Sequence, residues 1–144
     1  KRRDGMRTQE QAIAMGRGHL EYYRAMVRRG EIVSVMSLSD LDAAVVAWEK
    51  PHAKTPIYHI LSMESADPIA DPDDVEFWWE SGLRVVGPAH FGHNTYIHGT
   101  FSEGGLKAPA KDLYKAMREV GMVLDITHMA DRLFGSPLIC GTVQ

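Results

Sequence analysis

Hydrophobic residues in this sequence switch between helical and strand-like spacing several times along the chain. From Gln9 to about Arg29 they recur every three or four residues, which predicts a helix, and residues 31–36 form a β-branched run that predicts a strand. Ser39 is expected to cap a second helix, because apolar residues follow it at helical spacing as far as Trp48. The first fifty residues therefore predict a helix, a strand and another helix.

The same alternation continues through the rest of the chain. The further elements expected are strands at 57–63, 83–86 and 122–127, a short helix between Asp71 and Gly82, a helix at 109–120, and the start of a fifth strand at 137–140. Strands that alternate with helices favour βαβ units and a parallel sheet, so the predicted fold class is α/β. Residues 87–105 are rich in Gly and His and lack periodicity, which predicts a long loop of the kind that often carries function. We interpret Trp48, Trp78 and Trp79 as packing residues between helices and sheet.

Three chemically capable side chains follow three successive predicted strands. Glu64 comes after the second strand, His90 after the third and His128 after the fourth. In parallel α/β folds the carboxyl ends of the strands meet at one edge, where function gathers. Imidazole and carboxylate groups are the ligands of catalytic zinc sites, and a carboxylate with two oxygens can bridge two metal ions. The spacing therefore makes these three residues candidates for a metal centre.

Structural roles are the competing interpretation of each of these residues. A histidine at a strand end is more often a hydrogen-bonded structural residue than a ligand, and Glu64 alone could simply cap its loop. His93 and His98 are expected to pack within the loop, and a local zinc site made of His90, His93 and His98 lacks a recognised spacing. Asp125 should point to the opposite face of its strand from His128, so we expect it to support a neighbouring element rather than bind metal.

Composition narrows the class of protein. The chain has 144 residues with a formal net charge of −3, which argues against a nucleic-acid binder held by bulk electrostatics. The one cysteine, Cys140, excludes an internal disulfide and a C-x-x-C site. No apolar run approaches the roughly 18 residues of a membrane helix. The first residues are polar and basic, without the apolar core of a signal peptide, so a cytoplasmic location is expected.

Four segments of the chain match a known pattern in order and rough spacing. Residues 62–68 read S-M-E-S-A-D-P, residues 82–92 G-L-R-V-V-G-P-A-H-F-G, residues 103–106 E-G-G-L, and residues 121–128 G-M-V-L-D-I-T-H. They resemble S-M-E-G-A-D-P, G-L-R-x-V-G-L-A-H-Y-G, E-G-G-L and G-M-I-L-D-V-T-H of the membrane (renal) dipeptidase family and its bacterial relatives. The resemblance covers most of the chain.

This resemblance implies a (β/α)₈ barrel with two Zn²⁺ ions that hydrolyses dipeptides through a metal-bound hydroxide. It implies that Glu64 bridges the two zinc ions and that His128 is a ligand of one of them. It further implies that His90 is a catalytic, substrate-binding residue that polarises the scissile carbonyl or stabilises the oxyanion. On this basis residues 1–144 would be the central portion of a single barrel domain, about half of the barrel, with a dipeptide as substrate.

The sequence also departs from the family. It contains no His-x-Asp pair for the other zinc ion, and no second zinc-binding His follows Cys140. Only nine residues separate Thr127 from Pro137, fewer than the dozen or so that a parallel crossover needs, and Ser65 replaces a glycine. We therefore expect the 144 residues alone to be inactive. A non-catalytic fragment or degenerate homologue, a barrel hydrolase with one metal ion, and a homodimer all stay open.

Overall fold

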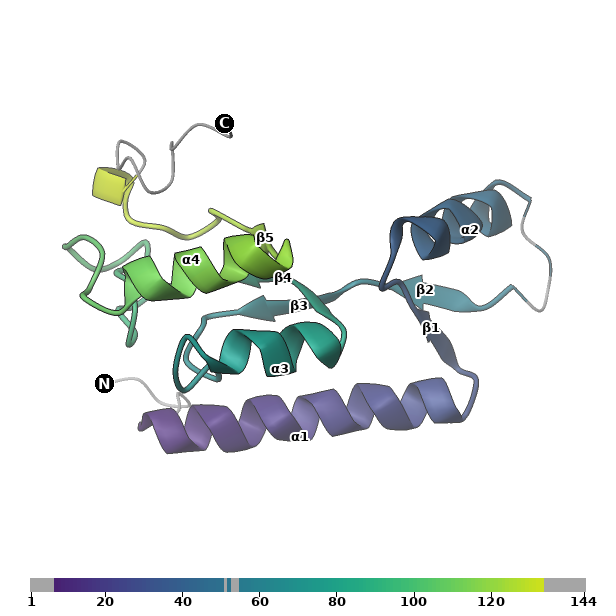
Figure 1. Ribbon diagram of the computed structural model, residues 1–144, viewed down its shortest axis with the longest axis horizontal. Helices are drawn as coiled ribbons and strands as arrows, with labels where there is room; N and C mark the ends of the chain where they lie inside the picture. The colour runs from purple at the N-terminus through teal and green to yellow at the C-terminus, as the bar shows by residue number, and fades with distance from the viewer. Residues whose placement is uncertain (1–6, 51, 53–54, 134–144) are drawn as a thin grey trace.

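A computed structural model describes residues 7–50, 52 and 55–133 of the chain. Its named strands pair in parallel and follow chain order within two small sheets (Figure 1). The first sheet contains β1 (Ile32–Ser34) and β2 (Ile57–His59), and the second contains β3 (Leu61–Glu64), β4 (Leu83–Gly87) and β5 (Val123–Leu124). The predicted α/β class with parallel strands is therefore confirmed.

The described residues form four α-helices, of which the first precedes β1 and the other three connect strands. They are α1 (Gln9–Arg28), α2 (Leu38–Glu49), α3 (Asp74–Glu80) and α4 (Ala110–Val120), and a 3₁₀ turn, η1 (Asp131–Leu133), follows β5. The predicted bounds of α1 and α4 agree with the structure to within one residue. Gly121 ends α4 at φ +84°, a left-handed conformation that glycine adopts without steric cost.

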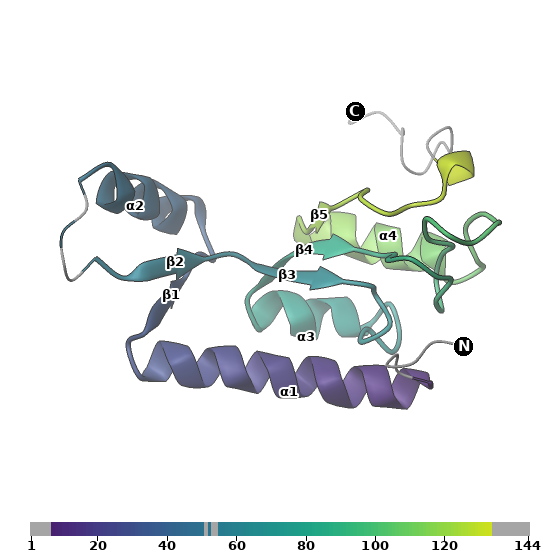
Figure 2. The same cartoon turned by 180° about the vertical axis from the view of Figure 1, so that it is seen from behind.

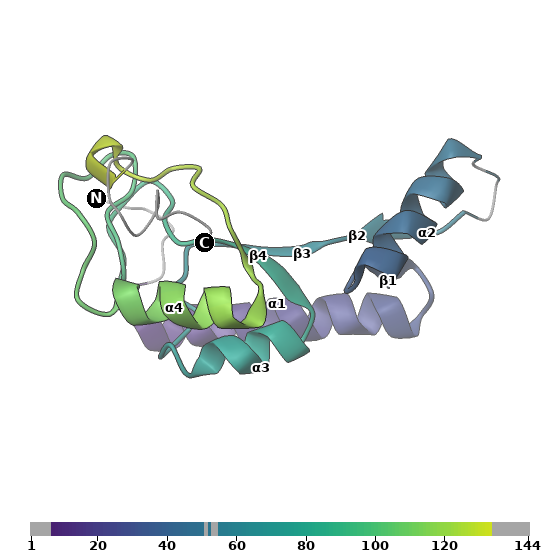
Figure 3. The same ribbon diagram turned by 45° about the horizontal axis from the view of Figure 1, so that its top comes forward.

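The hydrophobic core lies between the three-stranded sheet and the helices. Helices α1, α3 and α4 lie on the same side of the strands (Figure 3). Side chains that are almost completely buried come from both layers, among them Trp78, Leu83, Val86, Leu113 and Met117. This packing fixes the direction of β3, β4 and β5, and so it fixes where their carboxyl ends deliver the following residues.

Three expectations about the first half of the chain are wrong. The apolar run 57–63 is not one buried strand, because it splits at Ile60 into β2 and β3, which belong to different sheets. Trp48 does not pack between helix and sheet: it is 81% exposed, and α2 has no buried residue. Ser37, not Ser39, caps α2, since its hydroxyl accepts a hydrogen bond from the Asp40 backbone N–H at 3.2 Å.

Other expectations are confirmed in shortened form or fall outside the described residues. The predicted strand 122–127 retains only Val123 and Leu124, and the predicted strand 31–36 retains residues 32–34. The fifth strand expected at 137–140, with Cys140, lies outside the described residues. The assignment of residues 1–144 to one barrel domain stays a prediction. In the described part of the chain, no helix combines the length and apolar character needed to cross a membrane.

Candidate metal centre

The parallel sheet brings the three candidate residues to one edge. Glu64 is the last residue of β3 and pairs in register with Gly87, the last residue of β4, three positions before His90. His128 follows β5, the neighbour of β4. Strands β3 and β4 point toward the same end of the molecule, where their following loops gather (Figure 2). The three residues therefore lie together, as the parallel order of the strands predicts.

One carboxylate oxygen lies between the two imidazoles. Oε1 of Glu64 is 3.4 Å from Nε2 of His90 and 3.4 Å from Nε2 of His128. The potential ligand atoms of all three residues lie within 4.8 Å of one another, and no other group of three or more His, Cys, Asp or Glu side chains in the described ranges is placed in this way. The two rings meet edge to face, with centroids 4.9 Å apart.

These distances fit a tetrahedral zinc ion. Zinc binds nitrogen and oxygen at about 2.0–2.1 Å, and the edge of a tetrahedron is about 1.6 times that length, or about 3.4 Å. Both nitrogen–oxygen separations have this value. The side chain of Glu64 is 59% exposed, so water or substrate has access to a remaining position. Glu64 together with either imidazole therefore has the donor types and the spacing that zinc requires.

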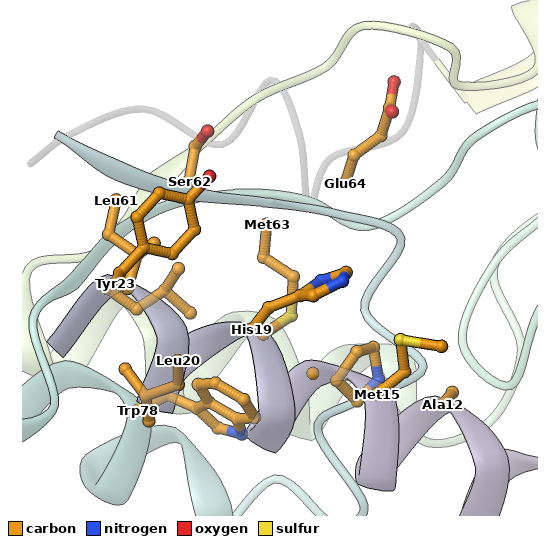
Figure 4. Close-up of a pocket in the computed structure, with 13 residues that line it drawn as sticks. Ala12, Met15, His19, Leu20, Tyr23, Leu61, Ser62, Met63, Glu64 and Trp78 are labelled. Atoms are coloured by element: carbon orange, nitrogen blue, oxygen red, sulfur yellow. The ribbon is translucent and has the colours of Figure 1, made fainter. Parts of the chain in front are cut away.

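The carboxylate of Glu64 extends away from α1. Figure 4 shows it on the opposite side of β3 from Met63, whose side chain points toward His19 on α1. A mainly apolar groove of about 270 Å³ lies on that α1 side, between α1 and β3. Glu64 is among the residues that line this groove, but its carboxylate points away from α1, toward the sheet face that the helices leave uncovered (Figure 3 and Figure 4).

Left-handed backbone conformations occur directly after Glu64 and at His128 itself. Ser65, directly after Glu64, has φ +71°, and His128 has φ +65°. The Ser65 N–H donates to the Gly87 carbonyl at 2.8 Å, which binds the end of β3 to the end of β4. A serine with this angle occupies the position where the dipeptidase family usually has glycine. The substitution is accommodated in the left-handed region at a steric cost.

The loop after β4 connects the histidines. The Thr100 N–H donates to the His90 carbonyl at 3.2 Å, and the Thr100 hydroxyl donates to the His128 carbonyl at 3.2 Å. The same hydroxyl oxygen is 3.4 Å from Nδ1 of His128. When Nδ1 carries the proton and donates it to Thr100, Nε2 of His128 keeps its lone pair for a metal ion. A Cβ added to Gly99 would lie 2.0 Å from the His90 carbonyl oxygen, so this close approach needs glycine.

The buried side chain of Asn94 holds the same loop in place through hydrogen bonds. It is 8% exposed, and its side-chain oxygen accepts hydrogen bonds from the N–H groups of Tyr96 and Ile97, each at 2.9 Å. Its amide donates to the Ser65 hydroxyl at 3.1 Å and to the Pro88 carbonyl. One buried side chain therefore links the segment after Glu64 to the segment before His90.

Tyr96 connects the same loop to the segment that precedes α3. Its hydroxyl donates to the Ile69 carbonyl at 2.7 Å, and the residue is 1% exposed. Burial raises the pKa of Tyr96 to about 12, because the phenolate would lose its hydration. The hydroxyl consequently stays protonated and donating near neutral pH.

The remaining sequence candidates do not join the centre. Asp125 lies outside the cluster, and its carboxylate accepts a hydrogen bond from the Thr127 N–H at 2.9 Å. Hydrogen bonds from the side chain and backbone of Thr127 hold the pKa of Asp125 below its usual range. The rings of His93 and His98 lie 5.9 Å apart, and within the described residues they form no metal-binding group with His90. The local three-histidine site is therefore absent from this part of the chain.

No protein-family model matches this sequence. A curated protein of Acinetobacter calcoaceticus, described as the uncharacterized protein in the PQQ-III 3′ region, is 32% identical over 84 residues, which are 52% of this chain and 27% of that protein. Among solved structures, an amidohydrolase from Pseudomonas aeruginosa gives a TM-score of 0.73 at 18% identity, covering 88% of this chain and 38% of that one.

Two dipeptidase structures give similar TM-scores. The probable dipeptidase PvdM from Pseudomonas aeruginosa gives a TM-score of 0.76 at 16% identity, covering 92% of this chain and 34% of its own. The dipeptidase AC, a metallopeptidase of family M19, gives 0.71 at 24% identity, covering 88% and 39%. The chain has the α/β fold of part of a (β/α)₈ barrel, as these similar structures do. It spans less than two fifths of the length of each of these proteins.

The sequence did not identify several residues that surround the centre. They are Phe91, Asn94, Thr100 and Phe101, which contact the candidate ligands or the loops that carry them. All of them lie in the aperiodic stretch 87–105, whose length and lack of pattern indicated function without identifying individual residues.

Proposed function

We propose that this protein is a metal-dependent dipeptidase and that Glu64, His90 and His128 belong to its active site. The observation that supports this most strongly is the position of one Glu64 oxygen, 3.4 Å from Nε2 of both imidazoles. The likeness of the fold to amidohydrolase and dipeptidase structures favours the same reaction class. A bound zinc ion would lower the pKa of a water ligand and polarise the peptide carbonyl.

Each residue has a distinct proposed role. Glu64 and His128 would hold the ion, with Thr100 fixing the orientation of the His128 ring. Among the described residues, Oε2 of Glu64 has no hydrogen-bond partner, which leaves it available to bridge to a second zinc ion. His90 would donate from Nε2 to the substrate carbonyl oxygen and offset the charge that develops there.

The test uses the full natural protein and compares Glu64→Gln with Glu119→Gln. Glu119 is an exposed residue of α4 whose contact with Lys115 is 3.9 Å, so its variant makes the same charge change away from the centre. We expect Glu64→Gln to lose bound zinc and at least 10²-fold in kcat/KM for dipeptides, on the order of removing one key electrostatic group. Glu119→Gln should retain both properties. Glu64→Gln protein with unchanged metal content and activity would refute the proposal.

A second variant separates the role of His90 from that of a ligand. His90→Gln should keep the zinc content measured by elemental analysis and lower kcat, because a group that acts mainly in the transition state contributes little to metal or ground-state binding. Loss of zinc in His90→Gln would instead make His90 a third ligand. The non-catalytic alternative, which rests on the absence of a His-x-Asp pair from the sequence, predicts no turnover by the wild-type protein in the presence of zinc.

A further inference from the structure

Two phenylalanines form an exposed aromatic surface beside the candidate metal centre. The rings of Phe91 and Phe101 stack with centroids 5.2 Å apart and an angle of 15° between their planes. The Phe101 N–H donates to the Phe91 carbonyl at 2.8 Å, so a backbone hydrogen bond fixes the two residues side by side. We call this pair the aromatic ledge.

The ledge is continuous with the histidines of the centre. The Phe91 ring lies 3.9 Å from the His90 ring and 5.1 Å from the His128 ring, measured between centroids. Phe101 contacts Phe91 and extends the row of rings outward. A molecule whose reacting group lies at Nε2 of His90 would therefore have its adjacent side chain beside Phe91 and Phe101.

Phe101 is not part of the hydrophobic core of the described residues. The residue is 79% exposed, whereas the aromatic residues of the core, such as Trp78 and Tyr96, are at most 2% exposed. An exposed apolar side chain is ordinary when it stands alone. Here two stacked rings adjoin a group of metal-binding type, and such a contiguous apolar surface is typical of a ligand site.

The chemistry of the ledge indicates what it binds. No Lys or Arg side chain in the described ranges lies over either ring, so an acidic side chain would find no counter-ion on the ledge. An aromatic or large apolar group would gain ring stacking and lose exposed surface. We propose that the aromatic ledge is the subsite for an aromatic or large apolar side chain of the dipeptide, which rests on the proposed dipeptidase function.

The test compares Phe101→Ala with Phe101→Tyr and Tyr22→Ala in the full natural protein. Tyr22 is an aromatic residue of α1 that is 61% exposed and lies outside the centre, which makes it a matched control. The measured quantity is the ratio of kcat/KM for Ala-Phe to that for Ala-Ala. We expect Phe101→Ala to lower this ratio about 10-fold, mainly through the KM for Ala-Phe, because the lost contact is made equally in the ground and transition states. Phe101→Tyr and Tyr22→Ala should keep the ratio.

Binding of the same two dipeptides, measured by calorimetry on metal-free protein so that they are not hydrolysed, tests the ledge independently of turnover. Wild-type protein should bind Ala-Phe more tightly than Ala-Ala, and Phe101→Ala should reduce the difference about 10-fold. An unchanged difference in Phe101→Ala, or equal wild-type affinities, overturns the subsite. Wild-type protein that binds Ala-Phe through Phe101 without hydrolysing it contradicts the proposed function and leaves the ledge supported.

Discussion

Replacing Asn94 with alanine tests whether a buried amide holds the candidate metal centre together. The side-chain oxygen of Asn94 satisfies the N–H groups of Tyr96 and Ile97, and these two residues are 1% and 0% exposed. Alanine at position 94 leaves both N–H groups buried without a partner. The change also removes the connection between Ser65 and Pro88.

The expected loss of stability follows from the number of groups left unsatisfied. An unpaired buried donor costs about 1–3 kcal/mol, so the two N–H groups account for most of the effect. The Pro88 carbonyl retains a hydrogen bond from the Ala66 N–H at 3.2 Å and adds little. Water that enters the vacated space moderates the total, and we expect a decrease in the free energy of unfolding of about 3 kcal/mol. That is a large share of the roughly 5–15 kcal/mol that stabilises a typical domain.

Urea denaturation, followed by tryptophan fluorescence, to which the buried Trp78 contributes, measures this loss. Asn94→Asp is the informative companion, since it keeps an acceptor for both N–H groups and loses only the amide donor. At pH 5 more of the buried carboxyl is protonated and donates to Pro88, so Asn94→Asp should be less destabilised there than at pH 7, relative to wild type. Zinc affinity should fall in Asn94→Ala. A loss below about 1 kcal/mol with unchanged zinc affinity would refute the reasoning.

Two further substitutions address the backbone and the buried phenol. Ser65→Val should lower the free energy of unfolding by about 1–3 kcal/mol, because a β-branched residue is poorly tolerated at φ +71°, whereas Ser65→Gly should change it by less than about 1 kcal/mol; equal losses in urea denaturation would contradict this. Tyr96→Phe should cost about 1 kcal/mol at pH 7, a modest loss because Nε2 of Gln9 also donates to the Ile69 carbonyl at 3.3 Å. Because the pKa of Tyr96 is raised from 10.0 to about 12, the stability that its hydroxyl contributes is complete below pH 10 and is lost as the pH rises through 12. The difference between Tyr96→Phe and wild type should therefore narrow between pH 10 and 12, and a constant difference would argue against a buried, protonated phenol.

Local periodicity correctly predicted helices that bury one apolar face in the core. Helix α4 is an example: Leu113 and Met117 repeat at helical spacing, both are buried, and Gly121 ends the helix. The three candidate site residues were found for a related reason. In a parallel sheet every strand ends at the same edge, so the order of strands alone places Glu64, His90 and His128 together.

Periodicity could not report contacts that depend on the tertiary arrangement. An unbroken apolar run does not reveal whether it lies in one sheet or two, and residues 57–63 divide between β2 and β3. Trp48 has the expected helical spacing, but it is 81% exposed and lines an open groove with Ile57 and Tyr58 of β2. Asn94 lies in a loop without a repeating pattern, and one of its hydrogen bonds reaches Ser65, 29 residues away, so nothing in the local sequence identifies this contact.

The backbone at the centre gives a separate reason to regard it as functional. Ser65 and His128 adopt left-handed conformations that cost about 1–2 kcal/mol each for residues with a Cβ. Neither residue caps a helix, and each is held by a contact to another loop: Ser65 through the Gly87 carbonyl and His128 through the Thr100 hydroxyl. Selection for stability alone would place glycine at such positions. Strain concentrated at the two proposed metal-binding segments, and maintained by surrounding hydrogen bonds, is what a site with a required side-chain geometry produces.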